Sequence, residues 1–363
     1  MDAIKRFLDC YIPVTTCNLR CSYCYVAQQG LFSQTPPRFE HSAQEVRRAL
    51  SKKRMGGTCA INFCAGGETL ISHDVLEMTL ELLKEGHYVM IVSNGLLSSR
   101  FDEIATWPTE LLVHLFIKFS FHFLELKRLD AFDTYFSNVK KMDRAGVSFT
   151  VELMPCDEEI PLIPEIKSIC MTHLGALCHC TIGRSDIDPE QRIPHLSKLP
   201  FDEYKKIWSV LNSELFQYKS QIFYHHQDGF CYAGDWSVCI HMGTGEMTQC
   251  YAGKHLDNIF DDLDRPLHFE AIGKHCTQAH CYNGHAFLAW GVIPEEKAPT
   301  YAELRNRETG DGKKWLKPEM KAFMSTKLCQ SNRKYPFWKK LIFDYSLQEA
   351  FHAAIHKGKA ESK

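Results

Sequence analysis

The sequence lacks a long uninterrupted apolar segment and a marked excess of charge of either sign. Its most apolar stretch, residues 111–126, is interrupted by polar and charged residues such as Lys118 and Glu125, so it cannot span a bilayer. The formal net charge is -2, whereas nucleic-acid-binding proteins usually carry a basic excess. We therefore expect neither a membrane nor a nucleic acid as a partner.

An export signal is also missing from the first residues. They contain neither an apolar stretch of about 7–15 residues nor a small-residue cleavage site, which a secretory signal needs. We therefore expect a cytoplasmic location, where reducing conditions work against structural disulfides. The chain nevertheless has 16 cysteines. Metal binding and catalysis are the leading explanations for them.

The order of the expected secondary structure indicates the fold class. There are no internal repeats; short β-branched or aromatic runs alternate with stretches of helical spacing. Strands are expected over 11–15, 60–64, 89–93, 116–121, 148–153 and 177–182, and helices over 42–53, 72–85, 98–106, 124–145 and 160–172. This alternation predicts parallel strands joined by right-handed crossovers. Residues 1–185 are therefore expected to form an α/β sheet or partial barrel, with ligands at the carboxyl ends of its strands.

The rest of the chain reads as three further segments. Residues 186–222 are expected to be a polar, proline-bearing linker followed by a helix over 202–218. Residues 223–291 contain short runs, glycine turns and many histidines and cysteines, and are predicted to be a small metal-stabilised subdomain. Residues 292–363 are predicted to be a helical extension that covers the barrel or this subdomain.

The strongest motif is a C-x3-C-x2-C run formed by Cys17, Cys21 and Cys24. Three thiolates on one tight loop can face a common point, and soft sulfur ligands suit an iron–sulfur cluster. A four-iron cubane held by three cysteines keeps one iron open, as a catalytic metal centre requires. A structural zinc knuckle is the alternative, but zinc needs a fourth ligand nearby.

With Tyr23 before its last cysteine, this run resembles the hallmark of the radical S-adenosylmethionine (radical SAM) family. The resemblance implies a partial (β/α)6 barrel and a 4Fe-4S cluster whose open iron binds S-adenosylmethionine. It further implies that one electron, from an external donor such as a flavodoxin or ferredoxin, cleaves this cofactor. The resulting 5′-deoxyadenosyl radical then abstracts hydrogen from a substrate.

Short motifs after the later strands extend the resemblance. Gly66-Gly67-Glu68 is similar to the family's GGE motif, which receives the methionine amino group, although Thr69 replaces the usual proline. Glycines permit close approach of the backbone, and a carboxylate can accept from an ammonium group. The turn at residues 93–95 resembles the family's ribose-binding turn. The cofactor-binding residues implied are Tyr23, Gly66, Gly67, Glu68, Ser93, Asn94, Ser120 and His122.

A second group of cysteines lies late in the chain. Cys231 is followed by thirteen residues, Gly245, four residues and Cys250. This spacing resembles the opening of the auxiliary-cluster extensions of some radical SAM enzymes, in the shortened form called a Twitch domain, related to the SPASM type. The resemblance implies a second 4Fe-4S cluster on Cys231, Cys250, Cys276 and Cys281. Zinc is the alternative, because Cys239, His241, His275, His280 and His285 lie among these cysteines.

Two single cysteines are candidates for a catalytic role. Cys178 and Cys180 are expected on one strand, where alternation points both to the same side. If that side is the barrel interior, a thiol there could return a hydrogen atom to a substrate radical, as an epimerase requires.

Three functions remain open. The first is oxidative modification or cross-linking of a peptide, which auxiliary-cluster members of this family commonly perform; about ten residues precede the first strand, so we expect no separate leader-binding domain. The second is a radical dehydrogenase or epimerase acting on a carbohydrate or another small polar metabolite. The third is a non-catalytic, zinc-stabilised interaction protein. For the second function, a sugar-sized pocket would be lined by His225, His226, Asp228, Asp235 and Trp236.

Overall fold

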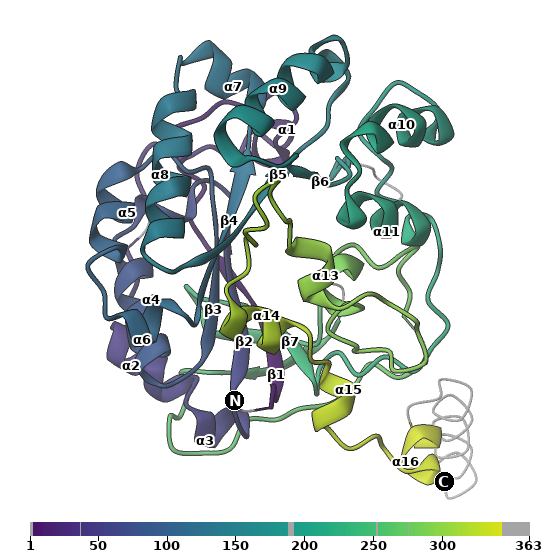
Figure 1. Ribbon diagram of the computed structural model, residues 1–363. Helices are drawn as coiled ribbons and strands as arrows, with labels where there is room; N and C mark the ends of the chain where they lie inside the picture. Colours follow the sequence, from purple (N-terminus) through teal and green to yellow (C-terminus); the bar gives the residue numbers. More distant parts are fainter. Residues whose placement is uncertain (1–2, 37, 188–191, 252, 275, 343–363) are drawn as a thin grey trace, which may run out of the picture.

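One open sheet runs through the molecule (Figure 1). The computed structural model describes residues 3–36, 38–187, 192–251, 253–274 and 276–342. In these residues the sheet has nine strands in the order β6-β5-β4-β3-β2-β1-β7-β8-β9. The first six are parallel: β1 (Arg6–Ile12), β2 (Cys59–Ala65), β3 (Tyr88–Ser93), β4 (Leu115–Phe121), β5 (Ser148–Leu153) and β6 (His179–Cys180).

The described part of the sheet does not close on itself, because β6 and β9 lie at its two edges. β7 (Ser237–His241) is parallel to β1, and β8 (Glu246–Thr248) and β9 (His255–Asn258) follow in antiparallel pairing. This arrangement confirms the predicted α/β class and its partial barrel. Residues 223–291, expected as a separate subdomain, thus continue the sheet through β7. The domain boundaries at 185, 222 and 291 stay a prediction.

Helices connect the parallel strands and cover the sheet (Figure 1). The early ones are α1 (Tyr25–Gln28), α2 (Ala43–Ala49), α3 (Lys52–Met55), α4 (Asp74–Lys84), α5 (Ser98–Ile104), α6 (Thr109–Leu112), α7 (Phe123–Arg128), α8 (Phe132–Arg144) and α9 (Ile163–Leu174). The later ones are α10 (Phe201–Trp208), α11 (Glu214–Ile222), α12 (Gly284–Phe287), α13 (Tyr301–Arg305), α14 (Pro318–Met324), α15 (Leu328–Ser331) and α16 (Phe337–Ile342). None of the described helices is long and apolar enough to cross a membrane.

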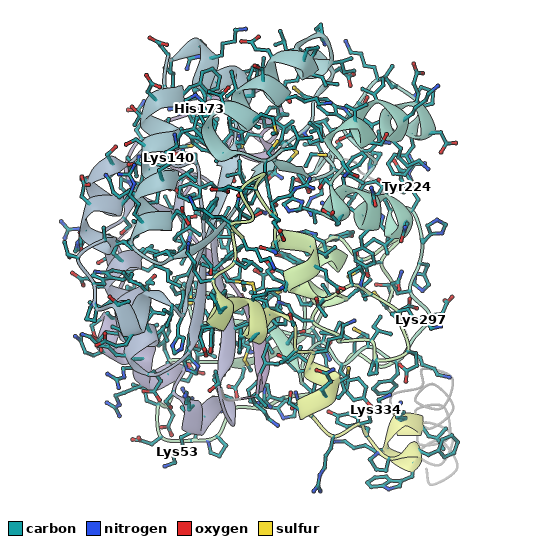
Figure 2. The ribbon with its side chains drawn as sticks, viewed as in Figure 1. Lys53, Lys140, His173, Tyr224, Lys297 and Lys334 are labelled. Atoms are coloured by element: carbon teal, nitrogen blue, oxygen red, sulfur yellow. The ribbon has the colours of Figure 1, made fainter. Side chains whose placement is uncertain are left out.

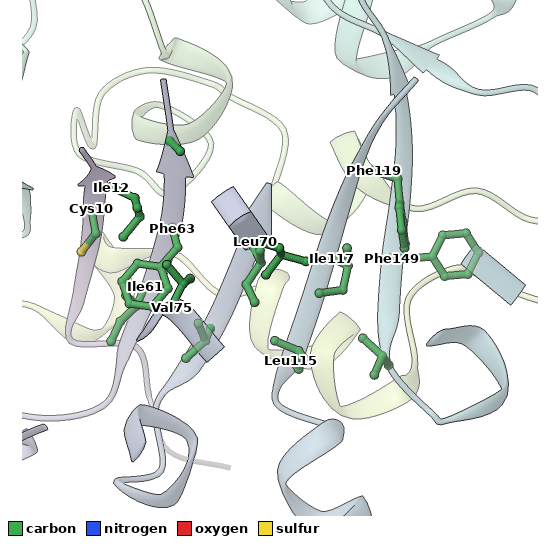
Figure 3. Packing of buried hydrophobic residues seen from close by; sticks show 14 of the residues in the cluster. Cys10, Ile12, Ile61, Phe63, Leu70, Val75, Leu115, Ile117, Phe119 and Phe149 are labelled. Carbon is green, nitrogen blue, oxygen red and sulfur yellow. The ribbon is translucent and has the colours of Figure 1, made fainter. Parts of the chain in front are cut away.

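The sheet is packed on both faces by different parts of the chain. On its outer face, residues such as Cys10, Ile61, Ile117 and Phe149 join the early helices in one apolar cluster (Figure 3). Their chain neighbours point to the inner face, where side chains such as Phe7 meet the late segment; Phe7 lies 5.4 Å from the ring of Phe287. Burial on both faces explains why these strands are near-continuous apolar runs.

Several expected elements differ from the observed ones; the helix expected over 42–53, for example, is divided into α2 and α3. The first strand is Arg6–Ile12 rather than 11–15. The sequence pattern missed it because a charged residue, Asp9, lies in the middle of the strand, where it is buried on the inner face. The helix expected over 124–145 breaks at Asp130, and that over 202–218 breaks at Asn212. Both residues adopt left-handed backbone, with φ of 51° and 47°. Asp and Asn tolerate this conformation better than other non-glycine residues.

His87, directly before β3, makes the stability of the fold dependent on pH. It is 0% exposed; its Nδ1 accepts from the Cys59 N–H at 3.1 Å and its Nε2 donates to the Leu50 carbonyl at 2.9 Å. Only a neutral imidazole can do both. Burial lowers the pKa of His87 from 6.5 to about 4. The unfolded chain therefore binds an extra proton below pH 6.5, and stability is lost as pH falls toward 4.

We expect the free energy of unfolding to fall by about 2 kcal/mol between pH 7 and pH 5 through this residue alone. Urea unfolding at both pH values should show a smaller fall in His87→Gln than in the wild-type protein. His73→Gln, at an exposed position, is the matched control and should keep the wild-type fall. Equal falls in the wild-type protein and His87→Gln would contradict the assignment.

Candidate active site

The three early cysteines lie on the loop that follows the carboxyl end of β1. Cys21 is buried with Leu19, Tyr23 and Cys156, and Cys17 and Cys24 pack against this group. Burial raises the pKa of Cys17 to about 11 and that of Cys21 to about 12, and nearby thiols add to both shifts. The thiols are thus close enough to influence one another. Cys17 and Cys21 therefore need a bound cation to become thiolates at neutral pH.

These cysteines fit an iron–sulfur cluster better than a single metal ion. Within the described residues, no group of three or more His, Cys, Asp or Glu side chains is arranged to hold a metal ion. A structural zinc ion needs four such ligands around one point. A cubane binds each thiolate at a different iron, so its ligands need not converge. Three sulfur donors on one loop, without a fourth partner, suit the cubane.

The glycine turn after β2 packs directly on the chain that leads into the cysteine loop. The Gly67 N–H donates to the Val14 carbonyl at 2.6 Å, and the Glu68 N–H donates to the Thr16 carbonyl at 3.0 Å. A Cβ atom on Gly67 would lie 2.7 Å from the Thr16 carbonyl carbon and still closer to its oxygen. Only glycine therefore fits at position 67, which packs on Thr16, the residue directly before Cys17.

The Glu68 carboxylate connects this turn to the one after β3. Glu68 is 2% exposed, and it accepts hydrogen bonds from Ser93 Oγ at 2.8 Å and from the Asn94 N–H at 2.7 Å. The Asn94 side chain in turn donates to Asn18 Oδ1 at 2.6 Å and lies 3.8 Å from Cys17 Sγ. The three motifs thus form one bonded unit. The expected role of Glu68 toward a methionine amino group stays a prediction.

Tyr23, which is buried with Cys21, makes a side-chain contact with His122. Tyr23 Oη lies 2.9 Å from His122 Nδ1, and the two rings are stacked. Burial lowers the pKa of His122 to about 4 and raises that of Tyr23, so a neutral imidazole faces a protonated phenol at pH 7. Ser120 lies near the carboxyl end of β4, opposite Glu152. The expected cofactor-binding residues thus lie at the carboxyl ends of β1 to β4.

The four late cysteines line one small cavity. Cys231, Cys250, Cys276 and Cys281 surround a volume of about 50 Å³, with apolar neighbours such as Leu288. Burial raises the pKa of Cys281, and the other three thiols raise it further. The cavity therefore brings together the four residues that the spacing singled out.

The alternative zinc ligands do not share this arrangement. Of those in the described residues, only His280 lines the cavity, and neither of its ring nitrogens has a hydrogen-bond partner there. Cys239 and His241 lie on β7, and the His241 Nδ1 accepts from the Thr244 N–H at 3.1 Å. His285 is buried outside the cavity lining. His275 lies outside the described residues.

Cys178 and Cys180 face the same side, as alternation predicts, but that side is not the barrel interior. Both thiols belong to the outer apolar cluster, together with Cys170 and Leu153, and are fully buried. β6 pairs with β5 so that Cys180 is opposite Leu153, whereas His179 is opposite the inward-facing Glu152. The two cysteines therefore face the helices, and neither can reach a substrate inside the barrel.

The predicted sugar-sized pocket is also wrong, because its residues lie in different environments. Trp236 is buried and stacks on Tyr232 at 3.8 Å. Asp235 pairs with Arg6 at 3.3 Å. His225, His226 and Asp228 are exposed on the surface.

One feature of the sequence indicates further functional residues and was not included among the predicted ones. It is the presence of a polar residue within each of four apolar strands. Asp9, Asn62, Lys118 and Glu152 all lie on the inner face of the sheet. Because apolar residues fill the remaining positions of a strand buried on both faces, one polar side chain marks a place where the interior is not an ordinary core.

Comparison with known proteins agrees with this geometry. Residues 11–157 match the family model of the radical SAM superfamily. The matched segment begins in β1 and includes the cysteine loop, the glycine turn and His122. No curated protein matches the chain in sequence.

Two solved structures show the same fold. Streptococcus suis SuiB bound to S-adenosylmethionine is 15% identical, with a TM-score of 0.50 over 72% of this chain and 65% of SuiB. This chain therefore spans just under two thirds of SuiB. The anSMEcpe structure with bound AdoMet and the Cp18Cys peptide is 16% identical, with a TM-score of 0.50 over 96% of this chain and 99% of anSMEcpe.

Proposed function

We propose that this protein is a radical SAM enzyme that abstracts hydrogen from a peptide substrate. The observation that carries the proposal is the bonded unit in which Glu68 and Asn94 tie two strand ends to the Cys17 loop. The cluster would supply one electron that splits S-adenosylmethionine into methionine and a 5′-deoxyadenosyl radical. An external flavodoxin or ferredoxin is the proposed electron donor.

Each residue of the unit has a separate task in this proposal. Cys17, Cys21 and Cys24 would hold three irons; Cys21 is buried, and Cys17 and Cys24 are partly buried against it. The Asn94 amide stands beside Cys17 Sγ, where it can donate to a thiolate. Glu68 fixes Asn94, and Tyr23 and His122 form a rigid neutral wall for the ligand.

Two substrate classes have support. The peptide class is supported by anSMEcpe, because its complex contains a peptide and its structural match covers nearly all of both chains. A small polar metabolite is the second candidate, and the polar inner face of the sheet favours it. The lining of the late cavity supports a second 4Fe-4S cluster on Cys231, Cys250, Cys276 and Cys281. Such a cluster would carry an electron from a product radical or help to place the substrate.

We expect wild-type protein reconstituted without oxygen to hold roughly eight irons and to form 5′-deoxyadenosine from S-adenosylmethionine and dithionite. Replacing Cys250 and Cys276 with alanine should leave roughly four irons and spare this cleavage, because only the late ligands are lost. Iron analysis and chromatography of the nucleoside measure both results. Cys329→Ala, a thiol outside both groups, is the control and should match the wild-type protein.

The outcomes separate the parts of the proposal. Wild-type protein that stays colourless and forms no 5′-deoxyadenosine would sink the radical SAM function. Two zinc ions in that protein would favour a zinc-stabilised interaction protein instead. If the double variant kept the iron content of the wild-type protein, only the assignment of a second cluster would be contradicted.

A further inference from the structure

The inner face of the sheet carries a group of charged side chains that the cofactor does not use. Asp9 and Asn62 lie side by side on β1 and β2, and Lys118 and Glu152 lie on β4 and β5. Lys118 is three residues from the carboxyl end of β4, the edge where the cysteine loop and Ser120 lie. Loops and helices from the second half of the chain add Arg184, Lys219 and Arg305.

The acidic members of this group already have partners. Asp9 accepts from Asn62 Nδ2 at 2.8 Å and from the Tyr251 hydroxyl at 2.6 Å. The side chain of Glu152 is 2% exposed and forms ion pairs with Arg305 at 2.9 Å and with Lys118 at 3.1 Å. Neither of these ion pairs has the geometry of a hydrogen bond. Neither carboxylate is available to balance a further cation.

The cations are balanced less completely. Arg184 pairs with Asp186 at 3.2 Å and also donates to Asn283 Oδ1 at 3.4 Å. Lys219 is 7% exposed; its Nζ donates to Thr181 Oγ1 at 2.6 Å, and no ion pair joins it to an acid in the part of the chain that the structure describes.

One positive charge is therefore in excess on this face. The group contains four cations, counting Arg305, against the carboxylates of Asp9, Glu152 and Asp186. A buried charge without a partner is costly, so it either loses its proton or binds an ion of opposite charge. A single excess charge matches a monoanion, and the planar guanidinium of Arg184 matches a carboxylate.

The position of Arg184 places this charge between the two groups of cysteines. Asn283, to which Arg184 donates, lies two residues after Cys281. The N–H of Asp186, the ion-pair partner of Arg184, donates to Gln28 Oε1 at 3.4 Å, and Gln28 lies four residues after Cys24. An anion held near Arg184 would therefore lie within the same interior as both candidate cluster sites.

We infer that Lys118, Arg184 and Lys219 bind a carboxylate group of the substrate on the inner face of the sheet. This inference rests on the proposed function, because it assigns the substrate of that site. The carboxylate can belong to a glutamate or aspartate side chain of a peptide or to a small organic acid. In both cases it would anchor the substrate while the reacting carbon lies toward the cysteine loop.

Binding is then coupled to the uptake of a proton. Burial lowers the pKa of Lys219 well below its usual range, and Arg184 and Lys118 lower it further against the opposing effect of Glu152. Arg305 adds to the lowering. Burial lowers the pKa of His280 and His285, and the charge of Lys219 lowers both further. A bound carboxylate reverses this balance at Lys219. Binding therefore weakens as pH rises and Lys219 loses its proton.

Isothermal titration calorimetry on the anaerobically reconstituted full chain with S-adenosylmethionine tests the inference. The probes are the peptide acetyl-Ala-Glu-Ala-amide with its glutamine counterpart, and lactate with lactamide. We expect a charged probe to bind at least about tenfold more tightly than its neutral partner, and Lys118→Met and Lys219→Met to remove that preference. Lys219→Arg should retain it. Lys140→Met, on the outer surface at α8 (Figure 2), is the control and should bind like the wild-type protein.

Each outcome decides the inference. Preference for the glutamate peptide assigns a peptide carboxylate, and preference for lactate assigns a small acid. Equal binding of charged and neutral probes, no binding of any probe, or an unchanged preference in both methionine variants would overturn it. If the carboxylate is not bound but 5′-deoxyadenosine still forms, the inference is wrong and the proposed function stands. If the carboxylate is bound but no 5′-deoxyadenosine forms, the proposed function is wrong and the carboxylate site stands.

Discussion

Replacing Cys17, Cys21 and Cys24 together with alanine is expected to reduce 5′-deoxyadenosine formation to the level of a sample without protein. The reason is the loss of the three sulfur ligands, which removes roughly four irons and with them the electron that cleaves the sulfonium. Iron analysis, visible absorbance and chromatography of the nucleoside after addition of dithionite measure the effect. The irons assigned to the late cysteines should remain.

A nearby thiol offers a matched control for this triple variant. Cys156 packs in the same buried group as Cys21 but lies on a different segment, after β5. Cys156→Ala should therefore keep the early cluster and its activity, although packing beside the loop has changed. If the triple variant still formed 5′-deoxyadenosine at the wild-type rate, the assignment of these three cysteines as cluster ligands would be wrong.

The second large effect is expected from Gly67→Ala. The added methyl group would lie 2.7 Å from the carbonyl carbon of Thr16 and 2.9 Å from that of Thr15, and backbone cannot move away as a flexible side chain can. Overpacking of this kind costs about 3 kcal/mol or more when the neighbour is rigid. We expect the midpoint of urea unfolding to fall accordingly and cluster assembly to fail, because the displaced segment leads directly into Cys17.

The adjacent glycine is the control for this prediction. A Cβ atom on Gly66 would lie 3.2 Å from the Tyr11 hydroxyl, a contact that a small shift of the tyrosine side chain relieves, and 3.4 Å from the Val14 carbonyl oxygen, an ordinary van der Waals distance. Gly66→Ala should therefore cost less than Gly67→Ala and should retain iron. If the two variants were equally stable, the close approach at Gly67 would not be a constraint.

Local motifs made much of the fold and the early site predictable. The cysteine spacing, the glycine turn and the residues at 93–95 each depend on neighbours in sequence, and their strands lie in the expected order. The side that Cys178 and Cys180 face could not be predicted in this way. β6 has only two residues, His179 and Cys180, so pairing with β5 decides which side both cysteines face, and no pattern within 177–182 contains that pairing.

The inner charged group could not be assembled from the sequence for a related reason. Its members come from β1, β2, β4, β5, the segment after β6, α11 and α13, and only the folded sheet brings these elements together. A lysine within an apolar strand, as at position 118, indicates an unusual interior, but not its partner. The failed sugar pocket shows the converse, since residues adjacent in sequence at 225–236 lie in different environments.

Strand β1 is shared by two halves of the sheet, with β2 on one side and β7 on the other. The scaffold of the early cysteines thus depends on residues that come more than two hundred positions later in the chain. A protein cut after residue 185 would leave one side of that strand with unpaired amides and would uncover Phe7. The segment that matches the radical SAM model is therefore not a removable module, and fusion or truncation designs have to carry β7 with it.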